Sequence, residues 1–242
     1  MQSLNRIVAI LTVVADSAEP VAPVRVAEAT NLSLSTVARV MRDMADEGLL
    51  ERHASQGTYI LGRKLFALTQ RAARNSSSNY GINSVLAHVR DVTGETTSLH
   101  VRSQGLRLCI AAAESRHEVR SVMSPGVTMP LIESATGDVL LACAPDDERE
   151  SELDAAHLNT SKRRELVARL EIVRAQGYAL NVNSPRNGMT GLAMAVRRGN
   201  ETIAALLVSG PGTRYTGRIA RDQIDFVREE AERLGAVMPA SI

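Results

Sequence analysis

Apolar residues near the start of the chain recur every three or four positions, which is the spacing of one face of an α-helix. The first such stripe consists of Leu4, Ile7, Leu11 and Val14. The spacing predicts helices over about 4–16, 24–30 and 35–47. Asn31 lies in the short turn between the second and third helices, and asparagine accepts the left-handed conformation at modest cost. Two short helices joined in this way are typical of a helix-turn-helix.

A different pattern follows the third predicted helix. Gly48 is well placed to end that helix in a left-handed conformation. The next stretch, "LLERHASQGTYILG", predicts two short strands around a loop tipped by Ser55, Gln56 and Gly57. Residues 63–74 return to a helical pattern, and the polar run "NSSSN" at 75–79 predicts a domain boundary.

Helical and strand patterns alternate in the rest of the chain. Three helices are predicted in this part. The first covers about 82–92, the second follows the loop at the start of "SATGDVLLACA", and the third covers 160–176. Strands are predicted for "TTSLHV", "LRLCIAAA", "EVRSVM", "GLAMAVRR" and "TIAALLVSG". Gly199 and Asn200 form a good hairpin turn between the last two strands. One final helix carries the apolar stripe Ala220, Ile224, Val227, Ala231 and Leu234. This order of helices and antiparallel strands predicts an α+β sandwich.

The third helix has the two faces of a recognition helix. Its apolar side consists of Val37, Val40, Met41 and Met44. Ser35 is the expected N-cap, which places Thr36 and Arg39 near the helix start, where such helices reach base edges. The polar hairpin after it is typical of a wing. The predicted DNA-contacting residues are Arg25, Ser33, Ser35, Thr36, Arg39, Arg42, Arg52, His53, Gln56 and Thr58. The competing interpretation is an ordinary helical bundle with a β-arm.

Composition narrows the function classes. The 242 residues contain no Trp and only 2% aromatic residues, so few rings are present on which single-stranded nucleic acid could stack. The net charge is +1, but no Asp or Glu occurs between Arg52 and Arg90, which indicates a surface that faces a polyanion. No apolar run reaches the roughly 18 residues of a membrane span, so we expect a cytoplasmic protein.

Catalytic and metal-binding patterns are weak. Cys109 and Cys143 are the only cysteines, and with His100 and His117 nearby their spacing matches no zinc motif, so buried thiols are expected. No G-x-S-x-G elbow occurs, and "SGPG" is a turn rather than a phosphate loop. We therefore expect no metal, no cofactor and no enzymatic activity.

The residues, taken together, resemble the IclR family of bacterial transcription regulators. The resemblance rests on "VAEATNLSLSTVARVMRDMADEGLLER" and "GTYILG" in the first part of the chain. In the second part it rests on "TGETTSLHV", "PGVTMPLIESATGDVLLA", "IVRAQGYAL" and "AALLVSGPGTRYTG". It implies an α+β protein with a winged helix-turn-helix over 1–62, a linker helix and hinge over 63–79, and a GAF-like effector-binding and oligomerisation domain over 80–242.

The same resemblance implies a function. Family members bind operator DNA as homodimers or homotetramers, repress or activate, and respond to small metabolites that are often carboxylates or aromatic compounds. It places the effector against Ala135, Thr136, Asn181, Met189 and Gly191. Loop amides and the Thr136 hydroxyl at a helix start are suited to a carboxylate. Alternatives that stay open are a metabolic enzyme built on the C-terminal sandwich and a ligand-blind architectural DNA binder.

The chain departs from the family pattern near this loop. Ile132, Glu133 and Asp138 replace the usual His, Ala and Lys. Further departures are Ser184 for a usual Glu, Ala195 for a usual Pro, and Leu34 where a basic residue is common. Together these departures predict an atypical, less acidic ligand, and the loss of the lysine weakens the case for an anion at the pocket rim.

Overall fold

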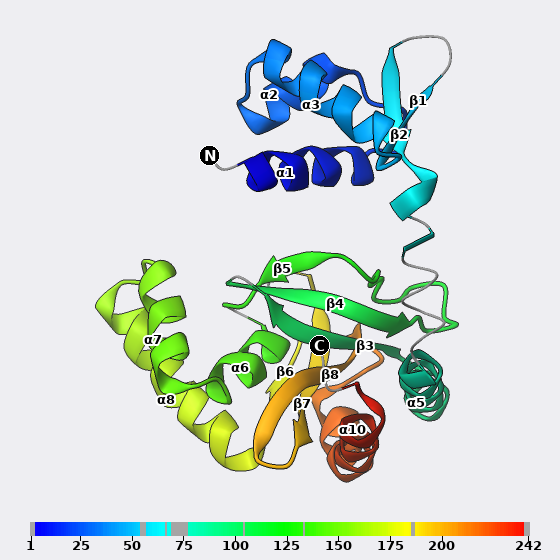
Figure 1. The fold of residues 1–242 in the computed structure, drawn as a ribbon. Helices are drawn as coiled ribbons and strands as arrows, with labels where there is room; N and C mark the ends of the chain where they lie inside the picture. Colours follow the sequence, from blue (N-terminus) through cyan, green and yellow to red (C-terminus); the bar gives the residue numbers. More distant parts are fainter. Residues whose placement is uncertain are drawn as a thin grey trace. The chain divides into compact units, whose positions relative to one another are not determined.

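The computed structural model describes residues 3–53, 57–65, 67–68, 77–103, 105–132, 134–184 and 187–239. The chain divides into two compact units, Met1–Ser76 and Ser77–Ile242 (Figure 1). Each unit has its own buried apolar cluster, and each is described by itself below.

The first unit is a helix-turn-helix followed by a β-hairpin. Its elements are α1 (Ser3–Ala15), α2 (Pro23–Thr30), α3 (Leu34–Asp46), β1 (Leu50–His53) and β2 (Thr58–Leu61). Asn31 has φ = 55° and Gly48 has φ = 73°, so both predicted left-handed turn residues are confirmed. Each of the three helices begins one residue earlier than predicted, because apolar periodicity locates the body of a helix and not its ends.

One apolar cluster holds these elements together. Ile10 of α1, Val26 of α2 and Val37 and Met41 of α3 are fully buried in it. The hairpin joins the cluster through Tyr59, whose backbone exchanges two hydrogen bonds of 2.8 Å with Val21. This extra pairing fixes the hairpin against the helices, because a two-stranded hairpin alone is only marginally stable in water.

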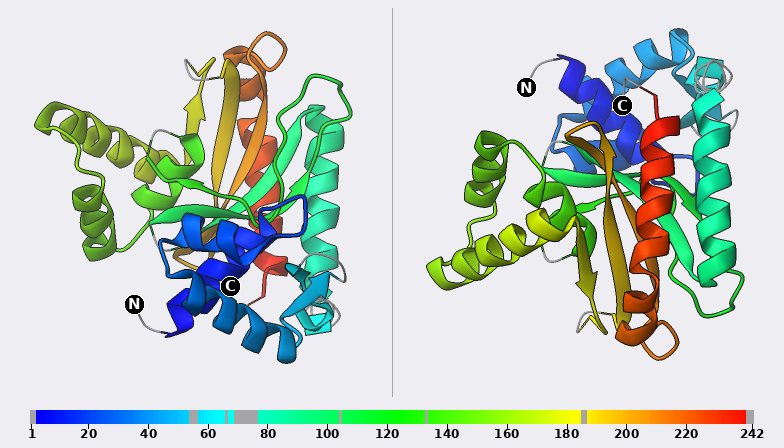
Figure 2. Two further views of the ribbon diagram at one scale, coloured as in Figure 1. Left: turned by 90° about the horizontal axis from the view of Figure 1, so that it is seen from above. Right: turned by 90° about the horizontal axis from the view of Figure 1, so that it is seen from below.

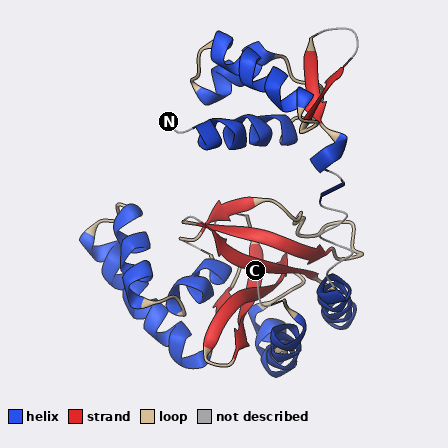
Figure 3. Cartoon of the chain, viewed as in Figure 1, coloured by secondary structure: helices blue, strands red, loops and turns tan. Residues whose placement is uncertain are grey.

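The second unit is built around an antiparallel sheet. Its strands are β3 (Thr96–Ser103), β4 (Leu106–Ala113), β5 (Thr128–Pro130), β6 (Tyr178–Asn181), β7 (Met189–Arg198) and β8 (Glu201–Pro211), in the spatial order β5-β4-β3-β8-β7-β6. Its helices are α5 (Ser77–Thr93), α6 (Ala135–Ala142), α7 (Asp146–Ala155), α8 (Thr160–Gln176), α9 (Gly217–Asp222) and α10 (Ile224–Val237). Figure 3 shows the helices lying on either side of this sheet, which confirms the predicted α+β sandwich.

Helices cover both faces of the sheet, and each face has its own side chains. Leu192, Met194 and Leu206 pack with α5 and α10, which run side by side in Figure 2. Ala193 and Ala205, one residue along each strand, pack with α6 and α8. Successive strand residues point to opposite faces, and both faces are covered by helices. The segments "GLAMAVRR" and "TIAALLVSG" are therefore apolar almost throughout.

Small residues allow α6 to approach the sheet and the end of β5. A Cβ built on Gly137, in the first turn of α6, would overlap the carbonyl oxygen of Leu131. Asp138 in the next position is buried, and it accepts hydrogen bonds of 2.8 and 3.1 Å from Arg169 of α8. The start of α6 is therefore fixed from two sides.

Two secondary-structure predictions were wrong, and two short strands were not predicted. "EVRSVM" (118–123) forms no strand, and β4 pairs instead with β5. Side chains hold the backbone of residues 118–123 instead. The Thr96 hydroxyl donates to the carbonyl of Ser121 at 2.6 Å, and Arg214 donates to the carbonyl of Val119 at 3.0 Å. Strands β5 and β6 were not predicted. The last helix is interrupted at Gln223, and periodicity missed the break because α9 and α10 bury one continuous apolar stripe.

No helix in the described part of the chain combines the length and apolar character needed to cross a membrane.

The close approach at Gly137 gives a first prediction. Gly137→Ala should lower the free energy of unfolding of the second unit by about 1–3 kcal/mol, because the added methyl group has no room beside Leu131. Urea denaturation measures this. Ser161→Ala, at an exposed position near the start of α8, is the control and should change stability by about 0.5 kcal/mol or less. Equal stability of the two variants would show that α6 does not lie this close to β5.

Candidate functional sites

The recognition helix begins one residue earlier than the sequence indicated. Ser33, not Ser35, is the N-cap of α3: its backbone is extended, and its hydroxyl accepts a hydrogen bond from the Thr36 amide at 3.3 Å. The Ser33 and Thr36 hydroxyl oxygens also lie 2.8 Å apart. Three hydroxyl residues at 33, 35 and 36 leave the cap ambiguous in sequence, since the hydroxyl of each could accept a hydrogen bond from an amide two or three residues further on.

The outer face of α3 is accessible. Ser35, Arg39 and Arg42 are exposed, as is Arg25 on α2, whereas Thr36 is half-buried beside the cap. On the opposite face Val37, Met41 and Met44 are buried. The helix therefore presents two exposed arginines, one turn apart, in the turns that follow its capped start.

The hairpin after α3 presents a smaller polar set than predicted. Arg52 is exposed, donates from Nε to the Tyr59 hydroxyl at 3.0 Å and lies 5.6 Å from the centre of the Tyr59 ring. His53 is exposed. Thr58 is a correction: it is only 9% exposed, so it is not available to contact DNA. Gln56 lies outside the described residues.

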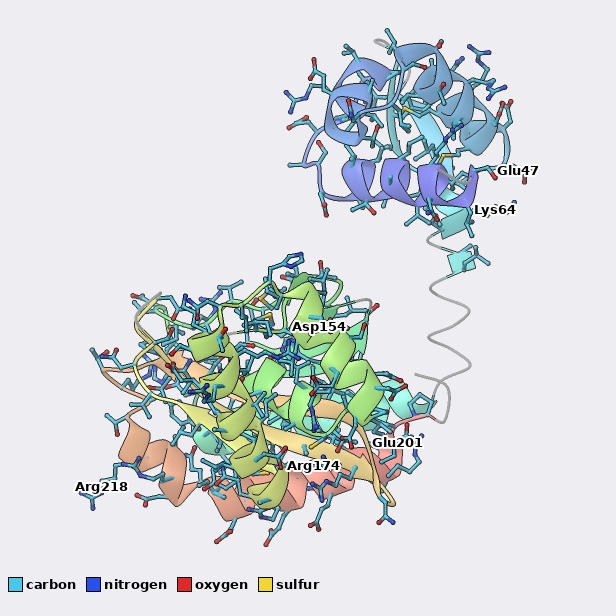
Figure 4. The ribbon with its side chains drawn as sticks, turned by 90° about the vertical axis from the view of Figure 1, so that its left-hand side faces the viewer. Glu47, Lys64, Asp154, Arg174, Glu201 and Arg218 are labelled. Carbon is cyan, nitrogen blue, oxygen red and sulfur yellow. The ribbon has the colours of Figure 1, made fainter. Side chains whose placement is uncertain are left out.

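The basic residues of the stretch from Arg52 to Arg90, which contains no acid, are in part paired with acids outside it. Arg63 lies 3.3 Å from Glu51, and Lys64 lies 3.1 Å from Glu47 (Figure 4). Arg90 pairs with Asp91 in the same way. Acidic residues just before and just after the stretch thus form ion pairs with its basic residues. A count of charges along the sequence does not reveal these pairs. Arg71 and Arg74 lie outside the described residues.

A pocket of about 370 Å³ lies in the second unit. Its walls come from the α6-side face of the sheet, the first turn of α6, and the segment around Ser121 and Met123. All five residues that the resemblance assigned to the effector line it: Ala135, Thr136, Asn181, Met189 and Gly191. They come from α6, β6 and β7, segments that are separated in sequence by as many as 56 positions, from 135 to 191.

The start of α6 forms one wall of this pocket. Ser134 is the N-cap, and its hydroxyl accepts a hydrogen bond from the Gly137 amide at 3.0 Å. Thr136 is therefore not the cap; it is 1% exposed and lines the pocket. Asp138 points away from the pocket to Arg169, so replacement of the usual lysine by this acid adds no negative charge to the lining. Burial raises the pKa of Asp138, and the bonds from Arg169 oppose that rise.

Sequence analysis missed Arg107, which lines the same pocket. Its side chain is 9% exposed, and Nη2 lies 3.2 Å from the Met129 sulfur. Its Nε and Nη1 are buried without a hydrogen-bond partner among the described residues. Burial lowers the pKa of this guanidinium, although arginine stays charged in proteins. The available signal was an arginine at an inward position of the otherwise apolar strand "LRLCIAAA".

Two further polar side chains are buried on the strands beside Arg107. His100 Nε2 lies 2.8 Å from the Ser98 hydroxyl oxygen, and its Nδ1 has no partner in the part of the chain that the structure describes. Burial, and next the charge of Arg107, lower the pKa of His100 to about 3. Cys109 is fully buried as expected, and burial raises its pKa to about 11, so the thiol stays protonated and is a poor nucleophile or ligand.

A winged helix-turn-helix joined to an α+β domain is the arrangement of two-domain transcription regulators. Two family models match the chain: the IclR helix-turn-helix domain over residues 3–54 and the C-terminal domain of the bacterial transcriptional regulator IclR over 80–236. The chain therefore belongs to the IclR family of DNA-binding transcription regulators. This confirms the resemblance, and it agrees with the prediction that the chain is not an enzyme.

Relatives and solved structures agree with this assignment. The HTH-type transcriptional regulator BhcR of Paracoccus denitrificans is 28% identical, over 97% of this chain and 86% of that protein. KdgR of Escherichia coli is 26% identical, over 86% and 81%. The IclR regulator of Alicyclobacillus acidocaldarius shares the fold with a TM-score of 0.83 at 23% identity, over 97% and 98%. An IclR homologue of Microbacterium hydrocarbonoxydans, solved with 4-hydroxybenzoate, has a TM-score of 0.78 at 22% identity, over 99% and 100%.

The buried His100 makes stability depend on pH. Its pKa in the folded state is about 3 and its unfolded value is about 6.5, so the unfolded chain binds an extra proton between these pH values. Stability is therefore lost as pH falls below about 6.5, by about 2 kcal/mol at pH 5 from this residue alone.

The variant His100→Gln isolates that contribution. The loss of unfolding free energy between pH 8 and pH 5 should be smaller in the variant by about 2 kcal/mol, whatever the absolute stability of each protein. Urea denaturation at the two pH values measures it. The same loss in both proteins would mean that His100 is not buried in its neutral form.

Proposed function

We propose that this chain is a sequence-specific operator-binding regulator whose DNA affinity is set by a small molecule in the pocket of the second unit. Residues 1–62 read DNA, 63–79 link the two units, and 80–242 bind the effector and hold the subunits of a homodimer or homotetramer together. The protein acts in the cytoplasm. One observation carries the proposal: a capped recognition helix with Arg39 and Arg42 exposed occurs in the same chain as a pocket lined by all five expected effector positions.

The geometry of α3 supports DNA reading. Residues in the first turns of a recognition helix contact base edges in the major groove, and arginine is the commonest reader of guanine. Arg25 and His53 are exposed on the neighbouring elements and would contact the phosphate backbone. In a dimer, two such heads bind half-sites whose centres lie about 10 bp or a multiple apart.

The pocket supports control by a ligand. Its volume and mixed polar and apolar lining match those of a small-molecule site. The homologue solved with 4-hydroxybenzoate shows that at least one protein of this fold binds a small organic molecule. For regulation, the ligand must shift operator affinity by a coupling free energy of about 1–3 kcal/mol.

Substitution of the two arginines tests the DNA-reading surface. Arg39→Ala and Arg42→Ala should each weaken binding to an operator, identified by selection from random DNA, by about 1–3 kcal/mol if they contact bases. Fluorescence anisotropy measures the affinity. Arg218→Ala removes the same charge from the second unit, where that side chain is 89% exposed, and should leave affinity unchanged (Figure 4). Normal affinity in both α3 variants would remove this face of α3 from the proposal.

The salt dependence of binding distinguishes the two roles that an arginine can have. Operator affinity should fall steeply with salt, with log K decreasing by about 0.9 per unit of log salt for each neutralised phosphate. A variant that loses a phosphate contact should show a slope shallower by about 1, whereas loss of a base contact should relax sequence preference instead. An affinity that is independent of salt would contradict DNA binding by these residues.

A further inference from the structure

One arginine of the predicted DNA-contacting set is held in place by a neighbouring side chain. Arg25, Arg39 and Arg42 are exposed, and none of them forms a hydrogen bond or an ion pair with a described side chain. Arg52 is exposed too, but its Nε donates to the Tyr59 hydroxyl at 3.0 Å, and its guanidinium carbon lies 5.6 Å from the centre of the Tyr59 ring. A flexible arginine loses side-chain entropy when it binds, so an arginine that is already fixed binds at a lower cost.

Tyr59 is itself fixed within the first unit. It is 3% exposed and belongs to the apolar cluster of that unit, and its backbone exchanges two hydrogen bonds of 2.8 Å with Val21. It lies directly opposite Arg52 in the β1–β2 register, so the two side chains share one face of the hairpin. The ring and hydroxyl of Tyr59 therefore form a support against which the longer side chain of Arg52 is ordered.

The contact with Tyr59 leaves part of the guanidinium free. Nε is occupied, and among the described residues no acceptor is bonded to Nη1 or Nη2 of Arg52. Asp46 and Glu51 line the same hollow as Arg52, but neither forms an ion pair with it, and Glu51 pairs with Arg63 instead. The two Nη groups at the end of the guanidinium fork match two oxygens of one phosphate.

The place of Arg52 in the fold favours the DNA backbone over base edges. Strand β1 follows α3 after only Glu47, Gly48 and Leu49, so the hairpin flanks the recognition helix (Figure 1). The Arg52 side chain lies against the ring of Tyr59 on the neighbouring strand, which shortens its reach into a groove. Contacts to the backbone on either side of a recognition helix fix the register and orientation of a protein on the duplex.

We propose that Tyr59 is a positioning residue for DNA binding, which holds Arg52 so that both of its Nη groups face one phosphate of the operator. This inference rests on the proposed function, since it assigns a contact to the wing of the same DNA-reading unit. Tyr59 does not touch DNA and acts through Arg52. It was not in the predicted DNA-contacting set, because a tyrosine in a short apolar strand is typical of a core residue.

The test is a double-mutant cycle on operator affinity, measured with the full chain by fluorescence anisotropy. Tyr59→Phe keeps the ring and its packing but removes the hydroxyl, so Arg52 loses its hydrogen bond. We expect this variant to bind the operator about 3- to 10-fold more weakly, because Arg52 must then be ordered on binding. Tyr80→Phe removes the same group from a tyrosine of the second unit that is 84% exposed, and it should leave affinity unchanged.

Arg52→Met completes the cycle. This variant should bind more weakly, and its slope of log K against log salt should be shallower by about 1, because one phosphate contact is lost. Operator and unrelated DNA should be weakened by the same factor, since a phosphate contact carries no sequence information. In the Arg52→Met background, Tyr59→Phe should have no further effect, because no arginine remains to be positioned.

Arg52→Lys provides a second test that does not depend on the folding of a Tyr59 variant. Lysine keeps the charge, but it has neither the Nε that bonds to Tyr59 nor the paired Nη groups. Operator affinity should therefore fall, whereas the salt slope should stay close to that of the parent chain.

Four results would overturn the proposal. They are parental affinity in Tyr59→Phe, parental affinity in Arg52→Lys, an unchanged salt slope in Arg52→Met, and an equal loss from Tyr59→Phe with and without Arg52. The last result would mean that Tyr59 acts only through the stability of the hairpin.

The α3 variants separate this inference from the proposed function. If Arg39→Ala and Arg42→Ala weaken operator binding but Tyr59→Phe does not, then α3 reads DNA and the positioning role of Tyr59 is wrong. If the full chain selects no operator from random DNA, the proposed function is wrong, and this inference is wrong with it.

Discussion

The second unit depends on one constraint: strands β7 and β8 are apolar on both faces, so helices must cover both. The two faces meet this demand differently. Leu192, Met194 and Leu206 fill the space under α5 and α10, whereas Ala193 and Ala205 leave room for α6 to come close. Because Gly137 also removes a side chain from the first turn of α6, that turn lies directly against the end of β5. The pocket is the space that remains between this turn and the sheet.

The pocket differs from the rest of the interior in the pairing of its buried charge. Where acids are buried in the described part of this unit, an arginine accompanies each of them, and the pairs hold elements in place: Asp138 joins α6 to α8, and Glu95 holds Arg214 against the backbone of Val119. Arg107 forms no comparable pair, since the one hydrogen bond described for its side chain is to a methionine sulfur. An unpaired buried charge is costly, so Arg107 lowers the stability of the folded unit.

Sequence was sufficient where a feature repeats or has a local cause. Helix and strand periodicity located most elements, and Asn31 and Gly48 marked their turns because few residues adopt a positive φ. Sequence did not identify the N-cap of α3, because the hydroxyls of Ser33 and Ser35 are equally able to cap a helix. It also missed the break at Gln223, because the apolar stripe continues with the same spacing on both sides of that residue. The effector positions came from family resemblance. Arg107 came from neither, because only the folded sheet shows that no acid faces it.

The bond between Asp138 and Arg169 has a mechanical consequence. It fastens α6, an eight-residue helix at the pocket, to α8, which has 17 residues and is about 25 Å long. The two helices also share one apolar cluster, so the ion pair and the packing together fix α6 against α8. If the pair turned as one body about the pocket end, a rotation of one degree would displace the far end of α8 by about 0.4 Å. A small shift at the pocket wall would then become a larger one at the outer surface of the domain.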